Sequence, residues 1–260
     1  MSDYVLDNAW EQERERLDAL TGRYDEESLA FCKRTGLAAG WRCLELGPGT
    51  GRFAQALADE VGPTGLVLAV DIDTRLAEPA ATANLEVRQL DIRTDPIPGG
   101  PFDLVHARLV IEHLPDRPAM LAKLADALRP GGWLVLEEFD NVTAYVCEPP
   151  SPVHAKVVDA VYATMRGAGF DDVYGRRLLH QLMAVGLTDL VVAGAVESIV
   201  TDVANGVPQW WLLVKQLEPP MLAAGLVTPE DLAAFDELLH DGTTTMYGPT
   251  LVRGRGRRVE

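Results

Sequence analysis

Short apolar runs alternate with helical patterns between residues 41 and 139. Two segments, 51–61 and 116–128, repeat apolar residues every three or four positions, as amphipathic helices do. The other runs are rich in Val and Leu and have the length of strands; they are residues 41–46, 65–72, 85–90, 102–107 and 132–139. Because strands that alternate with helices need crossover connections, the pattern predicts a doubly wound α/β fold with a mostly parallel sheet and right-handed crossovers.

Helical patterns also flank this core on both sides. Two helices are expected before it, at about 7–20 and 25–36, and Asp25 is expected to cap the second. The elements expected after the core are helices at 151–169 and 176–185, a strand-like run near 188–200, a helical block at 207–239 and a last strand at 243–253.

No repeat or low-complexity linker interrupts the chain, so a single domain over residues 1–260 is expected. Within it, residues 40–140 would form the core that binds a cofactor. An N-terminal helical lid at 1–38 and helical additions at 141–186 and 201–242 would then cover a ligand cleft and hold the second reactant.

Charge narrows the expected partners. Of the 260 residues, 23 are Lys or Arg and 39 are Asp or Glu, which gives a formal charge of −16. Such a surface repels phosphate backbones and anionic headgroups, so a small molecule is favoured over nucleic acid or a membrane. Four arginines that alternate with glycine near residue 255 indicate a solvated strand end rather than a basic patch; they are Arg253, Arg255, Arg257 and Arg258.

The sequence indicates a cytoplasmic protein with free thiols. No basic segment followed by an apolar one opens the chain, and no stretch approaches ~20 uninterrupted apolar residues. Cys32, Cys43 and Cys147 are widely spaced, odd in number and without a CxxC pair, so buried free thiols are expected rather than a disulfide frame or a zinc site.

The most informative segment is Glu45-Leu-Gly47-Pro-Gly49-Thr-Gly51, between the first core strand and the next helix. Glycine allows a sharp turn with positive φ and lets a ligand approach main-chain N–H groups without a Cβ in the way. A nucleotide-like ligand fits such a loop, although a tight turn without a ligand would have the same glycines.

A carboxylate at the end of the next strand favours the ligand. Asp71 lies twenty residues after Gly51, where it can accept hydrogen bonds from both hydroxyls of a ribose. Both a dinucleotide and an S-adenosylmethionine fold are consistent with this pair of features. The dinucleotide fingerprint GxGxxG fits less well, because the third glycine comes one residue early and Arg52 stands in its place.

In these segments the chain resembles the class I S-adenosylmethionine-dependent methyltransferases, which carry an acidic residue followed by GxGxG. The resemblance covers roughly residues 40–140 and extends through Leu90-Asp91-Ile92, FDLVHARLVIEHLPD at 102–116 and LRPGGWLVLEEFD at 128–140. It implies a Rossmann-like methyltransferase fold with a doubly wound, mostly parallel seven-stranded sheet, N-terminal helices and a helical cap. The flanks are similar to small-molecule methyltransferases of the secondary-metabolite type.

The resemblance also implies which residues contact S-adenosylmethionine and its product S-adenosylhomocysteine. Glu45 and the three glycines would surround the methionine end, and Asp71 would bind the ribose diol with Ile72 packed nearby. Asp91 would accept from the adenine amine, with Ile92 beside the ring. His106 and Ala107 would face the amino acid end mainly through the backbone. Several carboxylates suit a ligand that carries a sulfonium and an ammonium.

Methyl transfer needs a general base only when the acceptor must lose a proton, so catalytic residues are candidates rather than requirements. His113 follows the fourth strand, His154 lies in a region that often borders the acceptor in this family, and Asp140 ends the fifth strand. Packing roles are the alternative for both histidines. Asp140-Asn141 resembles the pair that holds a divalent cation in catechol-type enzymes, but the aspartate after the fourth strand is missing, so no metal is expected.

Aromatic residues outside the core are candidates for the acceptor pocket. Tyr4, Tyr145 and Trp210 are the ones we select, although core packing explains aromatic rings equally well. Tyr4 could come close to the cofactor if an N-terminal helix folds over it. The Leu, Val, Met and Trp content of the additions favours an acceptor with apolar area.

The resulting prediction is an enzyme that transfers a methyl group from S-adenosylmethionine to an O, N or C nucleophile of a small organic acceptor. One alternative is an S-adenosylmethionine-binding protein of the same fold that catalyses a reaction without methyl transfer, such as a cyclisation. An NAD-dependent oxidoreductase is disfavoured by the glycine spacing and by the absence of a Tyr-x-x-x-Lys pair. A homo-oligomer is compatible with the sequence, but no feature requires one.

Overall fold

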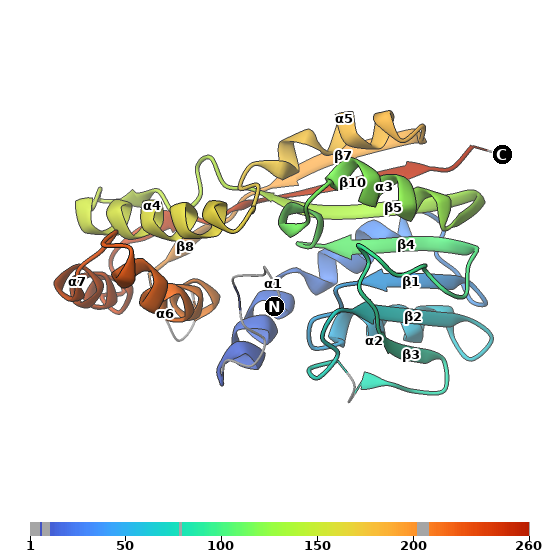
Figure 1. Cartoon of the computed structure of the whole chain (residues 1–260), viewed down its shortest axis with the longest axis horizontal. Helices are drawn as coiled ribbons and strands as arrows, with labels where there is room; N and C mark the ends of the chain where they lie inside the picture. The colour runs from blue at the N-terminus through green and yellow to red at the C-terminus, as the bar shows by residue number, and fades with distance from the viewer. Residues whose placement is uncertain (1–5, 7–10, 78–79, 202–207, 260) are drawn as a thin grey trace. The chain divides into compact units, whose positions relative to one another are not determined.

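The computed structural model describes residue 6 and residues 11–77, 80–201 and 208–259. Its largest element is a seven-stranded sheet in the order β3-β2-β1-β4-β5-β10-β7 (Figure 1). This confirms the predicted seven-stranded, doubly wound α/β fold. The strands are β1 (Arg42–Leu46), β2 (Leu66–Asp71), β3 (Leu85–Gln89), β4 (Phe102–Arg108), β5 (Leu128–Asp140), β7 (Thr188–Ala195) and β10 (Thr250–Arg257).

The central strands are parallel, with one register shift between β4 and β5 near Phe102 and Leu104. β1 pairs with β2 and β4, β2 with β3, and β4 with β5, each in the parallel sense. In this register Glu45 on β1 lies opposite His106 on β4. Because parallel strands end at the same edge, the loops that follow β1, β2 and β4 gather there, where open α/β sheets bind their ligands.

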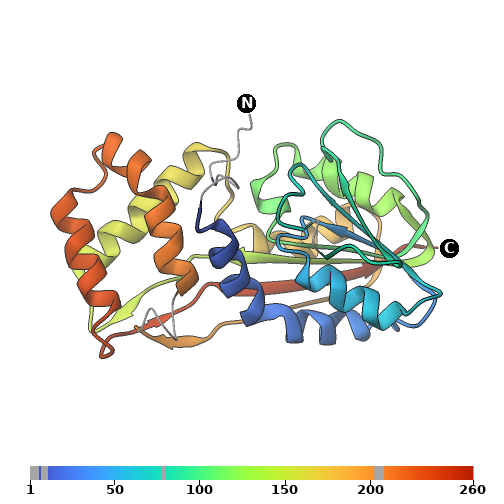
Figure 2. The same ribbon diagram turned by 90° about the horizontal axis from the view of Figure 1, so that it is seen from below.

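Helices cover both faces of the sheet, as the alternating pattern predicts. On one face, Leu44, Val105 and Leu134 pack with α3 and α5; on the other, Cys43, Leu104 and Val135 pack with α1 and α2. Figure 2 shows these helices on opposite sides of the strands. The helices and short 3₁₀ turns are α1 (Glu13–Lys33), α2 (Arg52–Val61), η2 (Ile111–His113), α3 (Arg117–Asp126), η3 (Tyr174–Arg177) and α5 (Leu178–Ala184).

The N-terminal region differs from the prediction. Over the described residues one continuous helix, α1, stands in place of the two helices expected at 7–20 and 25–36, and residues 7–10 lie outside the described part of the chain. Asp25 therefore lies inside a helix, and its predicted role as an N-cap was wrong. Its carboxylate instead accepts a hydrogen bond from the Arg108 guanidinium at 2.7 Å.

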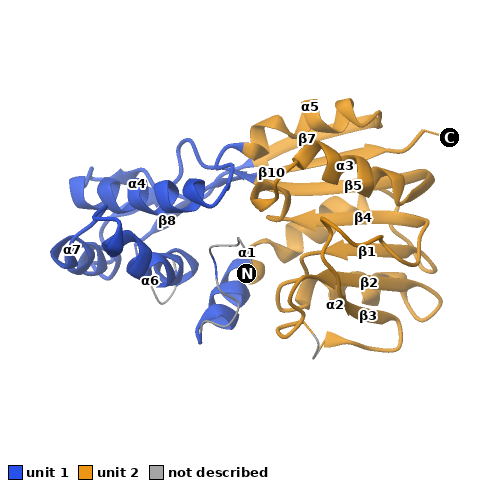
Figure 3. Cartoon of the chain, viewed as in Figure 1, with its two compact units in different colours: residues 1–20, 139–173, 195–251 blue, residues 21–138, 174–194, 252–260 orange. Residues whose placement is uncertain are grey.

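The chain divides into two compact units (Figure 3). Unit 2 holds residues 21–138, 174–194 and 252–260 and contains most of the sheet; unit 1 holds residues 1–20, 139–173 and 195–251. Unit 1 is mainly helical, with a separate three-stranded sheet in the order β6-β9-β8. Its further elements are α4 (Pro152–Gly167), α6 (Pro208–Ala223), α7 (Pro229–Leu239), β6 (Cys147–Glu148), β8 (Ser198–Val200) and β9 (Thr245–Tyr247).

Two predicted strands are each split in the structure. The run near 188–200 forms β7 and β8, and the run at 243–253 forms β9 and β10. All three cysteines are buried and free. Within the described part of the chain, no helix is long and apolar enough to cross a membrane.

Candidate active site

The glycine loop connects β1 to α2 and has the conformation that its sequence predicts. Gly47, Gly49 and Gly51 all have positive φ, at 70°, 57° and 82°. A Cβ at Gly47 would lie 2.3 Å from Cγ2 of Val110, so the backbone there also passes too close to a neighbour for a side chain. The loop therefore requires glycine both for its conformation and for its packing.

Asp71 lies at the end of β2, the position expected for a residue that binds the ribose hydroxyls. Its Oδ1 accepts the backbone N–H of Asp73 at 3.0 Å. Burial raises the pKa of Asp71 to about 6, although backbone hydrogen bonds oppose the shift. The next residue, Ile72, leaves 42% of its surface exposed. The apolar side chain of Ile72 is thus exposed next in sequence to a carboxylate that accepts few hydrogen bonds.

Asp91 and Ile92 follow β3 and have contacts of their own. The two oxygens of Asp91 accept hydrogen bonds from the Arg93 guanidinium, with Nη2 to Oδ2 at 2.8 Å. The hydrogen bond from Arg93 lowers the pKa of Asp91. Ile92 is buried in the core of unit 2 with Val70 and Leu90. An adenine amine would have to share Asp91 with Arg93, and the roles of both residues stay predictions.

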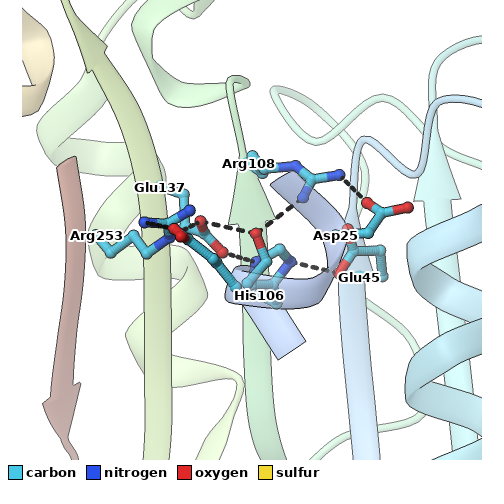
Figure 4. Close-up of polar contacts among 8 residues, drawn as sticks. Asp25, Glu45, His106, Arg108, Glu137 and Arg253 are labelled. Atoms are coloured by element: carbon cyan, nitrogen blue, oxygen red, sulfur yellow. Dashed lines mark hydrogen bonds and ion pairs between the residues drawn. The ribbon is translucent and has the colours of Figure 1, made fainter. Parts of the chain in front are cut away.

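A buried row of charged side chains crosses the sheet beside the loop (Figure 4). His106 lies between two glutamates: Nδ1 is 2.6 Å from Oε2 of Glu45, and Nε2 is 3.0 Å from Oε1 of Glu137. A positively charged imidazolium can donate from both of its ring nitrogens, one to each ionised carboxylate. Burial would lower the pKa of His106, but the two carboxylates raise it to about 9.

The row continues outward from Glu137. Its Oε2 accepts hydrogen bonds from Oγ of Ser28 and from Nε of Arg253, each at 2.9 Å. Arg108 donates to Ser28 at 2.8 Å and to Asp25 at 2.7 Å, which ties α1 to β4. Burial would raise the pKa of Glu137, but His106, Arg108 and Arg253 hold it below its usual value. Arg253 is only 8% exposed, so the prediction that it belongs to a solvated strand end was wrong.

Sequence reasoning missed most of this row. It selected Glu45 and His106 for the cofactor, and it expected His106 to act mainly through its backbone, whereas the imidazole bonds two carboxylates. Glu137 and Arg253 were not selected. The available signal was their position inside apolar strands, where a buried charge requires a partner of opposite sign. Ala107 is buried on the other face of the sheet.

Of the three candidate bases, His113 alone lies in unit 2. It ends the η2 turn, and its side chain is 13% exposed with Nε2 3.8 Å from Oε1 of Glu112. The neighbouring Glu138 is buried and accepts the N–H groups of Ile111 and Glu112 at 3.0 and 3.1 Å. Glu138 therefore holds the turn that presents His113.

The other two candidate bases lie in unit 1. His154 is 1% exposed, and burial lowers its pKa to about 4, so the ring is neutral near pH 7. Within the described residues its Nε2 has no hydrogen-bond partner. Asp140, at the end of β5, accepts the N–H of Val142 at 3.2 Å. Its neighbour Asn141 bonds Asp172 and Tyr162, and the described residues contain no group of three or more His, Cys, Asp or Glu side chains that could hold a metal ion.

Two of the aromatic candidates lie together in the core of unit 1. The rings of Tyr145 and Trp210 stack with centroids 3.8 Å apart, and Phe235 lies against both Trp210 and His154. Tyr145 and Trp210 are buried at 7% and 0% exposure, and their predicted contact with the acceptor stays a prediction. Tyr4 lies outside the described residues.

The residues at this edge of the sheet fit an adenosyl cofactor. The glycine loop brings main-chain atoms to the end of β1 with no Cβ on its three turning residues. Asp71 has a carboxylate suited to a diol, Ile72 an uncovered apolar surface suited to a base, and Glu45 a carboxylate suited to an ammonium. Among the described residues, the side-chain hydrogen bond of Glu45 goes through Oε2 to His106.

Comparison with known proteins gives the same class. A family model described as a methyltransferase domain matches residues 9–189, and the chain therefore belongs to the class I S-adenosylmethionine-dependent methyltransferase family, as its motifs predict. The chain is 31% identical to Methyltransferase str2 of Strobilurus tenacellus over 145 residues, which cover 55% of this chain and 52% of that protein. The chain spans about half the length of the curated relatives it matches.

Solved structures share the fold at low sequence identity. Phosphoethanolamine N-methyltransferase 2 of Haemonchus contortus, in complex with S-adenosyl-L-methionine, has a TM-score of 0.55 at 19% identity over 90% of this chain and 53% of that one. The [4+2]-cyclase SpnF has a TM-score of 0.54 at 18% identity over 91% of this chain and 82% of that one. These similarities support the methyltransferase fold. The reaction has to be inferred from the residues of the site.

Proposed function

We propose that this chain transfers a methyl group from S-adenosylmethionine to a nucleophilic O, N or C atom of a small organic acceptor. The observation that carries the proposal is the glycine loop after β1, with positive φ at Gly47, Gly49 and Gly51, beside carboxylates at Glu45 and Asp71. Membership of the methyltransferase family supports it.

The cofactor supplies a methyl group already activated by a sulfonium. The residues therefore have to bind the cofactor and the acceptor, align them and exclude water. Glu45 would accept the ammonium of the amino acid end, and the glycine loop would leave room for it. Asp71 would accept the two ribose hydroxyls, with Ile72 against the adenine. Asp91, Ile92 and the backbone of His106 and Ala107 would complete the contacts.

The acceptor would be a small molecule with apolar area. Neither a nucleic acid nor a membrane would be a partner. His113 is our first candidate for a general base, because it belongs to the same unit as the glycine loop. Asp140 and His154 are further candidates, and Tyr4, Tyr145 and Trp210 are candidates for acceptor contacts. A cytoplasmic location is part of the same proposal, and a homo-oligomer is compatible with it.

Calorimetric titration with S-adenosylmethionine, S-adenosylhomocysteine and NAD tests the cofactor. Binding of both adenosyl ligands without NAD supports the proposal, and binding of NAD alone overturns it. Methyl transfer is then tested with a cofactor that carries a labelled methyl group and a panel of phenols, amines and activated carbon acids. Transfer of the label to one of these acceptors supports the proposed reaction.

The alternative reaction on this fold is one without methyl transfer, such as a cyclisation. Product mass separates the two: a gain of one methyl group supports transfer, whereas an isomer of unchanged mass supports the alternative. His113→Ala provides a second test. If His113 acts as a base, this variant retains its melting temperature and loses turnover; if His113 serves packing, the melting temperature falls.

A further inference from the structure

Glu45 and Glu137 flank the same imidazole but have different surroundings. Glu137 accepts hydrogen bonds from three side chains, those of Ser28, His106 and Arg253, at 2.9 to 3.0 Å. The side chain of Glu45 bonds His106 alone among the described residues. The negative charge of Glu137 is therefore stabilised by three hydrogen-bond donors, whereas that of Glu45 is stabilised by one.

Burial makes this dependence costly. Glu45 and His106 are 2% and 0% exposed, and Phe53 of α2 packs against the imidazole with ring centroids 4.5 Å apart. Burial raises the pKa of Glu45, and the charge and hydrogen bond of His106 oppose that rise more than Arg108 does. A buried carboxyl that loses its cationic partner takes up a proton instead of staying ionised.

The charged and titratable groups around His106 come from five elements. Glu45 faces it from β1, Glu137 from β5 and Arg253 from β10, while Arg108 lies two residues along on β4. From α1, Asp25 pairs with Arg108 and Glu27 with Arg253. The thiols of Cys32 and Cys43 have pKa values raised by burial and stay neutral. The cations next to Glu45 are thus His106 and, farther away, Arg108.

We propose that His106 is a positioning residue for the cofactor: its imidazolium fixes Oε2 of Glu45 and keeps that carboxylate ionised, so that Oε1 can accept the ammonium of the amino acid end. This inference rests on the proposed function. In it, His106 touches neither the methyl group nor the acceptor, and it acts on cofactor affinity through Glu45.

A double-mutant cycle on ligand affinity tests the proposal. The variants are Glu45→Gln, His106→Gln and the pair, and the probes are S-adenosylhomocysteine and 5′-methylthioadenosine, which lacks the amino acid end. Each single variant is expected to bind S-adenosylhomocysteine roughly tenfold more weakly, as the loss of a charge-assisted hydrogen bond predicts. Methylthioadenosine should bind all variants within about twofold, and the pair should be no weaker than Glu45→Gln alone, because coupled residues are not additive.

Val135→Ala is the matched control, because Val135 pairs with His106 across β4 and β5 and its truncation loosens the same core without removing a charge. It should bind both probes like the wild type. Equal losses for the two probes in His106→Gln, or fully additive losses in the pair, would show a merely structural role and overturn the inference alone. If the wild type binds neither probe, the proposed function fails and the inference with it.

A second test uses only the unliganded wild type, so its result does not depend on whether the variants fold. Nitrogen NMR of the protein labelled at histidine should show both ring nitrogens of His106 protonated at pH 7, because both donate to carboxylates. A neutral ring at pH 7 would contradict the proposed charge and overturn the inference.

Discussion

Replacement of Glu137 by leucine should be among the most damaging single changes in unit 2. The side chain has no exposed surface and accepts hydrogen bonds from Ser28, His106 and Arg253. Leucine would leave the imidazolium and the guanidinium buried without their shared counter-charge. Breaking a buried ion pair from one side costs about 3–5 kcal/mol, which for a protein of this size corresponds to a fall in melting temperature of roughly 6–20 °C.

Guanidinium chloride unfolding, followed by far-UV circular dichroism and tryptophan fluorescence, measures this loss. Glu137→Gln keeps the shape and should lose less stability, about 1–3 kcal/mol, because a neutral acceptor still meets part of the donors. Glu86→Gln is the control: Glu86 pairs with Arg88 on the surface of β3, and its side chain is 46% exposed. A loss below about 1 kcal/mol for Glu137→Leu would refute the view that this carboxylate holds the two cations in the core.

Three further predictions concern pH and the loop. The pKa of Asp71 is about 6, so affinity for S-adenosylhomocysteine should fall as the pH drops below 6, whereas calorimetry of Asp71→Asn should show weak binding at every pH. The pKa of His106 is raised from 6.5 to about 9, so its stabilisation is complete below pH 6.5 and lost as the pH rises through 9; the melting temperature of the wild type should fall over that range more than that of His106→Gln. Gly47→Ala should cost about 2 kcal/mol by urea unfolding, because the new Cβ meets Val110, and Val110→Ala in the same chain should recover part of the loss.

The fold could be predicted from the sequence because its signals are local. Apolar runs at 41–46 and 85–90 fall within one residue of β1 and β3. The break expected near residue 22 was wrong because a glycine inside a helix costs only about 1 kcal/mol. Burial of Phe31 and Cys32 and the hydrogen bonds of Ser28 outweigh that cost and carry α1 through Gly22.

The candidate site could be predicted only in part. The glycine loop is contiguous, so its sequence predicts its conformation. The charged row joins residues far apart in the chain: Glu45 and His106 are separated by 61 positions, and Glu137 and Arg253 by 116. Their contact depends on strand order and register, which the spacing of a single sequence does not contain.

The row of buried charges also bears on synthesis by the ribosome. Ser28, His106 and Glu137 are synthesised before Arg253, which follows Glu137 by 116 residues. Arg253 lies on β10, the strand between β5 and β7. A nascent chain that stops before residue 250 would therefore hold an incompletely paired carboxylate beside the open edge of β5. Because an unpaired strand edge is a template for pairing with other chains, such a truncated chain should aggregate more readily than the full chain.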